Sequence, residues 1–220
     1  MNYLRLQLFD QDTCEHLLQQ LALEAEWQDG VLTAGSHAQS GKRNCQIRYD
    51  SELRLRIHRQ VEQAMWQSPV VKSFCLPRKL HRLYISKTES GGGYESHVDN
   101  AYMSSGRSDL SFTLSLTDHK NYGGGELEID SLSDTYPIKL HQGEIVIYPS
   151  TSLHRVCTVS EGLRIVCVGW IESYVKSEED RLCLFQLESG AKAMLAQHGR
   201  SEELDLIFLA YTNLLRRLGS

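Results

Sequence analysis

Three residues in the middle of the chain have the types and spacing needed to bind one metal ion. His97 and Asp99 stand two positions apart in the segment HVDN, and alternate side chains of an extended strand project from the same face. His154 lies 55 positions after Asp99, directly behind a strand-like segment that ends at Tyr148 and Pro149. Two imidazoles and a carboxylate from two strands are the ligand set that holds non-haem Fe(II) and leaves coordination positions open. Open positions indicate a catalytic rather than a structural metal.

Arg164, ten positions after His154, strengthens this interpretation. Strand periodicity places it on the same face as Val166, Val168 and Trp170. A guanidinium on so apolar a face is costly unless an anion neutralises it, and its fork matches a carboxylate bidentately. In isolation, an H-x-D pair in a chain with nine histidines is weak evidence, and a lone arginine of this kind indicates a structural ion pair. The combined spacing favours a metal site beside an anion-binding cation.

The segment that contains these residues, 79–173, has the two-residue periodicity of β-strands. From 110 to 116, leucine and phenylalanine alternate with serine and threonine, which predicts a half-buried strand. Further strands are predicted at 124–129, 144–149 and 163–173. Turn-forming Gly, Asp, Ser and Pro separate them at intervals typical of a sandwich or barrel. The middle of the chain is therefore predicted to be an all-β unit.

Two amphipathic helices are predicted before this unit. A D-x-x-E cap that begins at Asp12 opens the first, which continues to about Trp27. Ser51 caps the second, whose apolar residues recur every four positions. The stretch between them, 29–50, is rich in Gly, Ser, Lys and Asn without a sustained period, and it is predicted to be a loop. The two helices are expected to cover one side of the sheet.

A pair of helices is predicted at the C-terminal end. Ser177 begins an S-x-x-D cap, and apolar residues at helical spacing run from Leu204 to Leu218. This wide apolar stripe must be buried somewhere. The simplest interpretation is packing within the chain, and the alternative is a homodimer contact through these helices.

Composition bounds the class of protein. The 220 residues are 41% hydrophobic and 23% charged, which excludes a disordered or fibrous chain. The net charge of −5 argues against non-specific nucleic-acid binding. The longest apolar stretch, 165–171, is far shorter than the roughly 20 residues of a membrane span, and the charges at Arg5 and Asp10 do not fit a secretory signal. A cytoplasmic location without membrane partners is expected, and six cysteines without a C-x-x-C pair indicate reduced thiols.

The whole pattern resembles the Fe(II)/2-oxoglutarate-dependent dioxygenase superfamily, and more closely the PKHD-type hydroxylases of its prolyl-hydroxylase-like branch. The similar segments are RLYISKTESGGGYESHVDNA, RSDLSFTLSL, YGGGELEI, GEIVIYPSTSLHRVCTVSEGLRIVCVGWIES, SEEDRLCLFQLESG and YTNLLRRL, so nearly the whole chain participates. The resemblance implies that His97, Asp99 and His154 are the iron ligands. It implies that Arg164 binds the distal carboxylate of 2-oxoglutarate and that Tyr84 supports the same carboxylate.

The resemblance also implies a fold and a reaction. The fold is α+β with a double-stranded β-helix core of the jelly-roll, cupin-like kind; residues 1–175 form the catalytic domain with its N-terminal helices, and 176–220 form a C-terminal helical extension. The cofactors are Fe(II), 2-oxoglutarate and O2, with L-ascorbate as an optional addition. The enzyme hydroxylates an unactivated C–H bond and releases succinate and CO2. The substrate, a small molecule or a peptide, is left open among protein side chains, amino acids and siderophore-like molecules.

Two other functions compete with this one. The same fold with a metal is compatible with a non-catalytic sensor of iron or of a metabolite, and succinate formation coupled to O2 use separates the two. A zinc hydrolase also uses two histidines and a carboxylate with a water. Arg164 argues against the hydrolase, because a hydrolase has no need of a buried carboxylate clamp. Asp99 favours hydroxylation, since a small residue there opens a halide position and suggests a halogenase.

Overall fold

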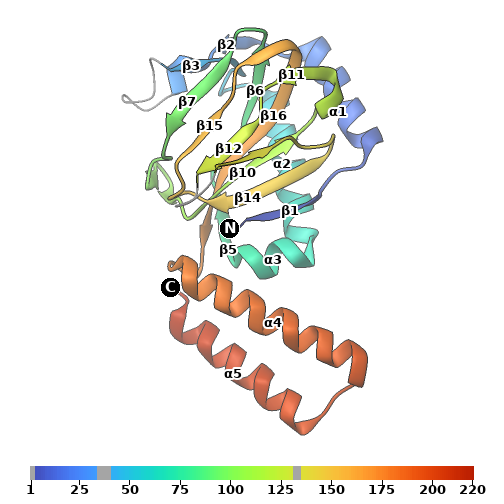
Figure 1. Cartoon of the computed structure of the whole chain (residues 1–220), viewed down its shortest axis with the longest axis vertical. Coiled ribbons are helices and arrows are strands. Elements are labelled where there is room, and N and C mark those ends of the chain that lie inside the picture. Colours follow the sequence, from blue (N-terminus) through green and yellow to red (C-terminus); the bar gives the residue numbers. More distant parts are fainter. Residues whose placement is uncertain (1–2, 34–40, 131–134) are drawn as a thin grey trace.

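The computed structural model describes residues 3–33, 41–130 and 135–220, and these form two facing antiparallel sheets with helices on one side and at the C-terminal end (Figure 1). The larger sheet has the order β1 (Leu4–Gln7), β14 (Glu144–Pro149), β10 (Leu110–Ser115), β16 (Val159–Ser173), β6 (Tyr84–Glu89), β4 (Cys45–Ile47) and β2 (Trp27–Asp29), and β5 (Pro77–Leu80) and β11 (Tyr122–Gly124) also pair with β16. The smaller sheet has the order β13 (Thr135–Ile138), β12 (Leu127–Asp130), β15 (His154–Val156), β7 (Gly93–His97) and β3 (Lys42–Arg43). Strands β8 (Tyr102–Met103) and β9 (Gly106–Arg107) form a separate hairpin. The predicted jelly roll with flanking helices is confirmed.

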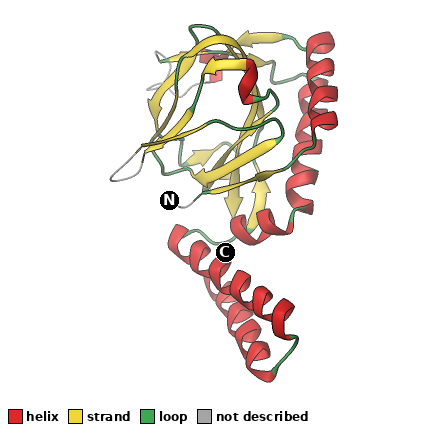
Figure 2. Ribbon diagram, turned by 45° about the vertical axis from the view of Figure 1, so that its right-hand side comes forward, coloured by secondary structure: helices red, strands yellow, loops and turns green. Residues whose placement is uncertain are grey.

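The helices occupy two places. Helices α1 (Gln11–Glu24), α2 (Glu52–Gln67) and α3 (Pro69–Cys75) lie beside the larger sheet, and α4 (Glu178–His198) and α5 (Glu202–Leu218) extend away from it as an antiparallel pair (Figure 2). None of the helices in the described ranges combines the length and the apolar character that crossing a bilayer requires.

The main core lies between the larger sheet and helices α1 and α2. Ile57 and Val61, one turn apart on α2, are fully buried in one cluster with Leu17 of α1, Phe112 of β10 and Ile147 of β14. Burying each such side chain contributes about 1.5–3 kcal/mol to folding. This helix layer holds the larger sheet rigid, and the opposite face of that sheet is left to line the barrel interior.

Strand β10 is buried on both faces, so its predicted half-exposure is wrong. Leu110, Phe112 and Leu114 face the helices, whereas Ser111 and its polar neighbours point into the barrel, and every residue of the strand is buried. Apolar and polar residues do alternate along β10, but the polar face lines the interior of the barrel and does not face water. Polar residues in alternation therefore mark an inner wall here.

Three local predictions are also corrected. The first helix is capped by Asp10, whose carboxylate accepts from the backbone N–H of Thr13, and not by Asp12. The stretch 29–50 is not simply a loop, because β3 and β4 pair with β7 and β6; residues 34–40 lie outside the described part. The predicted strand 124–129 is divided between β11 and β12, since Gly124 and Gly125 have φ angles of 64° and 69° and turn the chain.

The caps predicted for the later helices are confirmed. The hydroxyl of Ser51 accepts from the N–H of Arg54 at the start of α2, and that of Ser177 accepts from the N–H of Asp180 at the start of α4. The stripe on α5 is only partly buried: Leu204 is buried, Leu215 packs against a small cluster of Leu76, Val175 and Leu184, and Leu214 is 37% exposed.

Phe185 of α4 packs against the main core. Its ring meets that of Phe74 in α3 edge to face, with centroids 5.4 Å apart. We expect Phe185→Ala to lower the free energy of unfolding by about 2–3 kcal/mol, because a half-buried aromatic side chain and an aromatic pair are lost. Urea unfolding measures this loss, and Leu209→Ala, at a position 55% exposed on α5, should change stability by less than about 0.5 kcal/mol. Equal effects of the two variants would contradict the assignment.

Candidate active site

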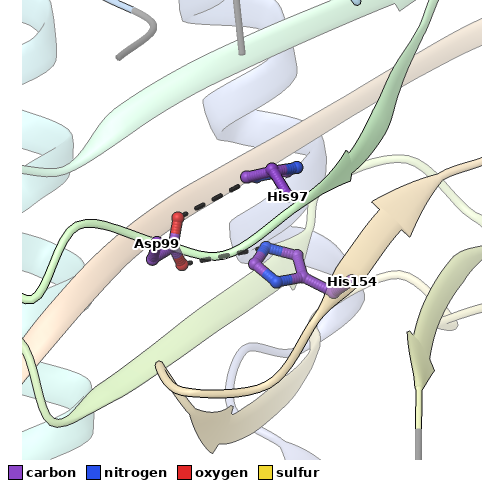
Figure 3. Close-up of side chains that lie close together, drawn as sticks. All are labelled: His97, Asp99 and His154. Atoms are coloured by element: carbon purple, nitrogen blue, oxygen red, sulfur yellow. Dashed lines mark ion pairs between the residues drawn. The ribbon is translucent and has the colours of Figure 1, made fainter. Parts of the chain in front are cut away.

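The cross-strand register of the smaller sheet brings His97 and His154 together. They are directly opposite each other on the antiparallel strands β7 and β15, and their ring centroids are 4.3 Å apart. Asp99, just beyond the end of β7, places Oδ1 3.9 Å from His97 Nε2 and Oδ2 3.7 Å from His154 Nε2 (Figure 3). One ligand atom from each of the three residues lies within 4.8 Å of the other two. The three predicted ligands thus converge on one point.

Backbone carbonyls set the tautomer of both imidazoles. His97 Nδ1 is 2.8 Å from the carbonyl oxygen of Glu95, and His154 Nδ1 is 3.0 Å from that of Ser152. A carbonyl only accepts, so each Nδ1 carries a proton, and Nε2 is the nitrogen of each ring that faces Asp99 and is left to bind a metal. Burial, and next the neighbouring His154, lower the pKa of His97 and favour its neutral form. Neutral Nε2 donors with oriented Nδ1–H groups are what a divalent metal requires, so the donor set fits Fe(II).

A chain of serine hydroxyls holds the carboxylate of Asp99. Ser111 Oγ donates to Asp99 Oδ2 at 2.6 Å, and it lies 2.8 Å from Ser150 Oγ. Ser150 Oγ in turn lies 2.9 Å from Ser108 Oγ. Ser111 and Ser150 belong to the inward-facing side of the larger sheet, so the sheet opposite the histidines orients the third ligand.

Removing the first hydroxyl of this chain should weaken metal binding without removing a ligand. We expect Ser111→Ala to raise the Kd for Fe(II) by roughly 10- to 100-fold, because outer-shell partners of ligands typically have effects of that size. Anaerobic titration with Fe(II) measures the change. Ser108→Ala, at the far end of the chain, is the matched control and should change the Kd less; an equal or larger effect of Ser108→Ala would contradict this assignment.

Arg164 is a buried cation in the barrel interior. It is 5% exposed, it stands opposite Thr88 of β6, and the hydroxyl of Tyr122 lies near its guanidinium. Nε has no hydrogen-bond partner, and no carboxylate lies within 4 Å of the guanidinium among the described residues. Burial lowers the pKa of Arg164, and the nearby hydroxyls of Tyr122 and Tyr148 oppose that shift. A cation in this state is suited to an anion that comes from outside the chain.

Tyr84 is not brought to Arg164. It stands opposite Val168, four residues along β16 from Arg164, which corresponds to about 13 Å of strand. Its ring instead contacts Trp170 edge to face, with centroids 5.7 Å apart. The tyrosines near the guanidinium are Tyr122 and Tyr148. Spacing along one strand did not reveal them, because they arrive from two other strands whose register is a tertiary property.

Sequence reasoning also missed Lys42, which lies in the stretch predicted to be a loop. Its backbone pairs with Tyr94, its Nζ is 5.2 Å from the centroid of that ring, and the same ring stacks on His97 at 3.7 Å. Lys42 is 7% exposed and donates to Thr33 Oγ1 at 3.0 Å. Burial lowers the pKa of Lys42 to about 8, although Asp99 opposes the shift. The alternation of Lys, Asn and Gln over 42–47 was the available signal for an inward-facing strand edge.

The chain is similar to several known proteins in sequence and in structure. The 2OG-Fe(II) oxygenase superfamily matches residues 81–172. The chain is 76% identical over 219 residues to the PKHD-type hydroxylase of Synechococcus sp. (strain CC9311), with 100% of both chains covered. A prolyl-4-hydroxylase from Pseudomonas putida has a TM-score of 0.54 at 16% identity, over 78% of this chain and 92% of that one. A prolyl hydroxylase from Trichoplax adhaerens, solved with a hypoxia inducible factor oxygen degradation domain peptide fragment, has a TM-score of 0.57 at 13% identity, over 83% of this chain and 86% of that one.

The jelly roll, its His-Asp-His cluster and the superfamily match together define an oxygenase of the 2OG-Fe(II) superfamily. Within that superfamily, the chain belongs to the PKHD-type hydroxylases. It is therefore an oxidoreductase of the dioxygenase class whose cofactors are Fe(II), 2-oxoglutarate and O2.

Proposed function

We propose that His97, Asp99 and His154 bind Fe(II), that Arg164 binds the distal carboxylate of 2-oxoglutarate, and that the enzyme hydroxylates an unactivated C–H bond with succinate and CO2 as coproducts. The observation that carries the proposal is the convergence of two imidazole Nε2 atoms and one carboxylate, within 4.8 Å of one another, in a barrel that contains a buried cation. When bound, the iron supplies the activation of O2.

The residues of the chain itself orient the proposed metal ligands and exclude water from the site. The carbonyls of Glu95 and Ser152 hold both imidazoles with Nε2 toward the metal position, and Ser111 holds Asp99. Arg164, with Tyr122 beside it, offers charge-assisted hydrogen bonds to a carboxylate deep in the barrel, where burial excludes competing water. A dicarboxylate held at its far end in this way presents its other end to the three ligands.

The substrate is proposed to be a small molecule or a peptide that contacts partly exposed side chains on the inward face of the larger sheet. Tyr84, Val168 and Trp170 are partly exposed on the inward face, which is the face that also carries Arg164. The related folds include a prolyl-4-hydroxylase and a prolyl hydroxylase solved with a peptide fragment, which supports a peptide as one of the two classes. Lys42 places a cation beside Tyr94 and His97, where it would attract a substrate that carries an anionic group.

The test measures cofactor binding and turnover in two stages. Anaerobic addition of Fe(II) and 2-oxoglutarate should produce a charge-transfer absorption band, and admission of O2 should then consume 2-oxoglutarate and release succinate in equal amounts. A non-catalytic sensor would give the band without succinate. A zinc hydrolase would give neither the band nor any O2 consumption, and either result would overturn the proposal.

We further propose that residues 1–175 form the catalytic domain and that 176–220 form a helical extension. All residues assigned to the iron and 2-oxoglutarate sites precede position 165, and α4 and α5 contact the rest of the chain through α3 and the cluster around Leu76. Leu206 and Leu209 of α5 are 65% and 55% exposed, so the predicted homodimer contact would use this face. Light scattering in solution tests the homodimer; a cytoplasmic location and stimulation by L-ascorbate stay predictions.

A further inference from the structure

A second cluster of histidine and aspartate lies at the other end of strand β10. Ser111, which touches Asp99, is near the start of that strand, whereas Asp118 and His119 follow its end, seven and eight residues further along the chain and beyond about 13 Å of strand. His141 comes from the turn before β14. Because β10 and β14 pair in the sheet, the two turns lie side by side. None of these residues takes part in the site proposed for iron.

Backbone and side-chain hydrogen bonds hold the two turns together. Gly143 N–H donates to the carbonyl of Ser115 at 2.8 Å, and the Gln142 side chain donates to the carbonyl of Leu116 at 2.9 Å. The geometry of the cluster therefore follows from the sheet and does not depend on long, free side chains.

The three side chains have the geometry of a metal site. One ligand atom from each residue lies within 4.8 Å of the other two, as in the cluster of His97, Asp99 and His154. His119 Nδ1 is 3.3 Å from Asp118 Oδ1, and His141 Nδ1 is 3.9 Å from Asp118 Oδ2. The two imidazoles meet at 87° with centroids 4.2 Å apart. Both rings thus direct a nitrogen toward opposite oxygens of one carboxylate.

The carboxylate of Asp118 is oriented before any ligand arrives. Its Oδ1 accepts from the backbone N–H of Lys120 at 3.0 Å, and its Oδ2 accepts from that of Gln142 at 3.4 Å. Burial opposes ionisation of Asp118, but these two N–H groups and the histidines keep its pKa below the ordinary value. A carboxylate fixed by two backbone N–H groups therefore lies between two imidazoles.

The contact between His119 and Asp118 is not a complete hydrogen bond. His119 Nδ1 is shielded from solvent and lies 3.3 Å from Asp118 Oδ1, but it makes no hydrogen bond in the described parts of the chain. A buried polar atom without a partner costs free energy, and such atoms call for an explanation. Coordination of a metal would satisfy it. The side chain of His141 is 55% exposed, which leaves a route for the ion and room for a water ligand.

We propose that Asp118, His119 and His141 form a second metal site, which binds Zn²⁺ and links the turn after β10 to the turn before β14. Two imidazoles, one carboxylate and a water are a common four-coordinate zinc set. Such a site binds Zn²⁺ more tightly than Fe²⁺ by the general order of divalent-metal affinities.

Zinc titration of full-length, metal-free protein separates the two sites. Calorimetry should show two Zn²⁺ per wild-type chain and one per His154→Ala chain, because His154→Ala disables only the first site. Adding His141→Ala to His154→Ala should weaken the remaining site at least about tenfold, since losing a ligand costs no less than losing an outer-shell partner. His198→Ala, at an exposed histidine outside both clusters, is the matched control and should leave both sites intact.

Thermal unfolding gives a second readout that needs no activity. Zn²⁺ should raise the Tm of His154→Ala, because a ligand that binds only the folded state stabilises it, and the rise should vanish in the variant that also carries His141→Ala. His119→Gln in place of His141→Ala should give the same loss. The proposal is overturned if His154→Ala binds no Zn²⁺ at micromolar concentration, or if His141→Ala and His119→Gln leave its titration unchanged.

Discussion

Arg164→Met should raise the Kd for 2-oxoglutarate by roughly 30- to 4,000-fold and, at the same time, stabilise the cofactor-free protein. The first effect follows because truncating one partner of a buried, hydrogen-bonded charge pair costs about 2–5 kcal/mol of binding. The second follows because the guanidinium is 5% exposed and has no carboxylate within 4 Å among the described residues. Removing an uncompensated buried cation should increase the free energy of unfolding by at least about 1 kcal/mol, even though the favourable interaction with the nearby hydroxyl of Tyr122 is lost.

The opposite signs of these two effects make the result diagnostic. Anaerobic titration of the Fe(II)-loaded protein with 2-oxoglutarate measures the Kd, and urea unfolding without cofactors measures stability. Arg164→Lys is the conservative control: it keeps the charge but not the two-pronged donor, so its Kd should lie between those of the wild type and Arg164→Met. A Kd unchanged in Arg164→Met would remove the assignment of this residue to the cosubstrate. A loss of stability in Arg164→Met would show that the guanidinium already has a partner within the fold.

His154→Ala should abolish turnover by removing one of the three proposed metal ligands. We expect the Kd for Fe(II) to rise by more than the roughly 100-fold that loss of an outer-shell partner can cause, and succinate formation to fall below detection. The charge-transfer band with Fe(II) and 2-oxoglutarate should disappear as well. Anaerobic absorption spectra and succinate release measure these effects.

Two comparisons distinguish loss of a ligand from loss of the fold. His154→Ala should keep a normal far-ultraviolet circular dichroism spectrum, because its neighbours in β15 remain paired with β12. His198→Ala, at an exposed helical position, should retain the band and the activity. A His154→Ala protein that still shows a full band would mean that the metal is held elsewhere, and the proposed ligand set would be wrong.

Several parts of this protein were predictable from the chain because they depend on neighbours in the sequence. The caps at Ser51 and Ser177 and strand 144–149 are local patterns, and each has its predicted place in the structure. The spacing of His97 and Asp99 and the inward face of Arg164 also follow from the period of two along a strand. The ligand role of these residues stays a prediction until metal binding is measured.

Features that join distant segments were not predictable in the same way. The two residues of β3 form a strand because β7 pairs with them, and Lys42 reaches the side of Tyr94 through that pairing. The burial of Ser111 was missed for a related reason: alternation marks two different faces without saying which of them meets water. Tyr84 was expected to support the carboxylate that Arg164 binds; the register of β6 and β16 sets it opposite Val168, four residues along β16 from Arg164.

The sequence by itself therefore determined the types of side chain available for chemistry, the local elements that carry them and the face of each strand on which they lie. Only the tertiary structure decided which of those faces meet, which tyrosines stand beside the buried guanidinium and which backbone carbonyls orient the imidazoles. The physical reason is the range of the interactions. Periodicity and capping arise within a few residues of chain, whereas strand register is selected by the packing of the two sheets and their helices as a whole.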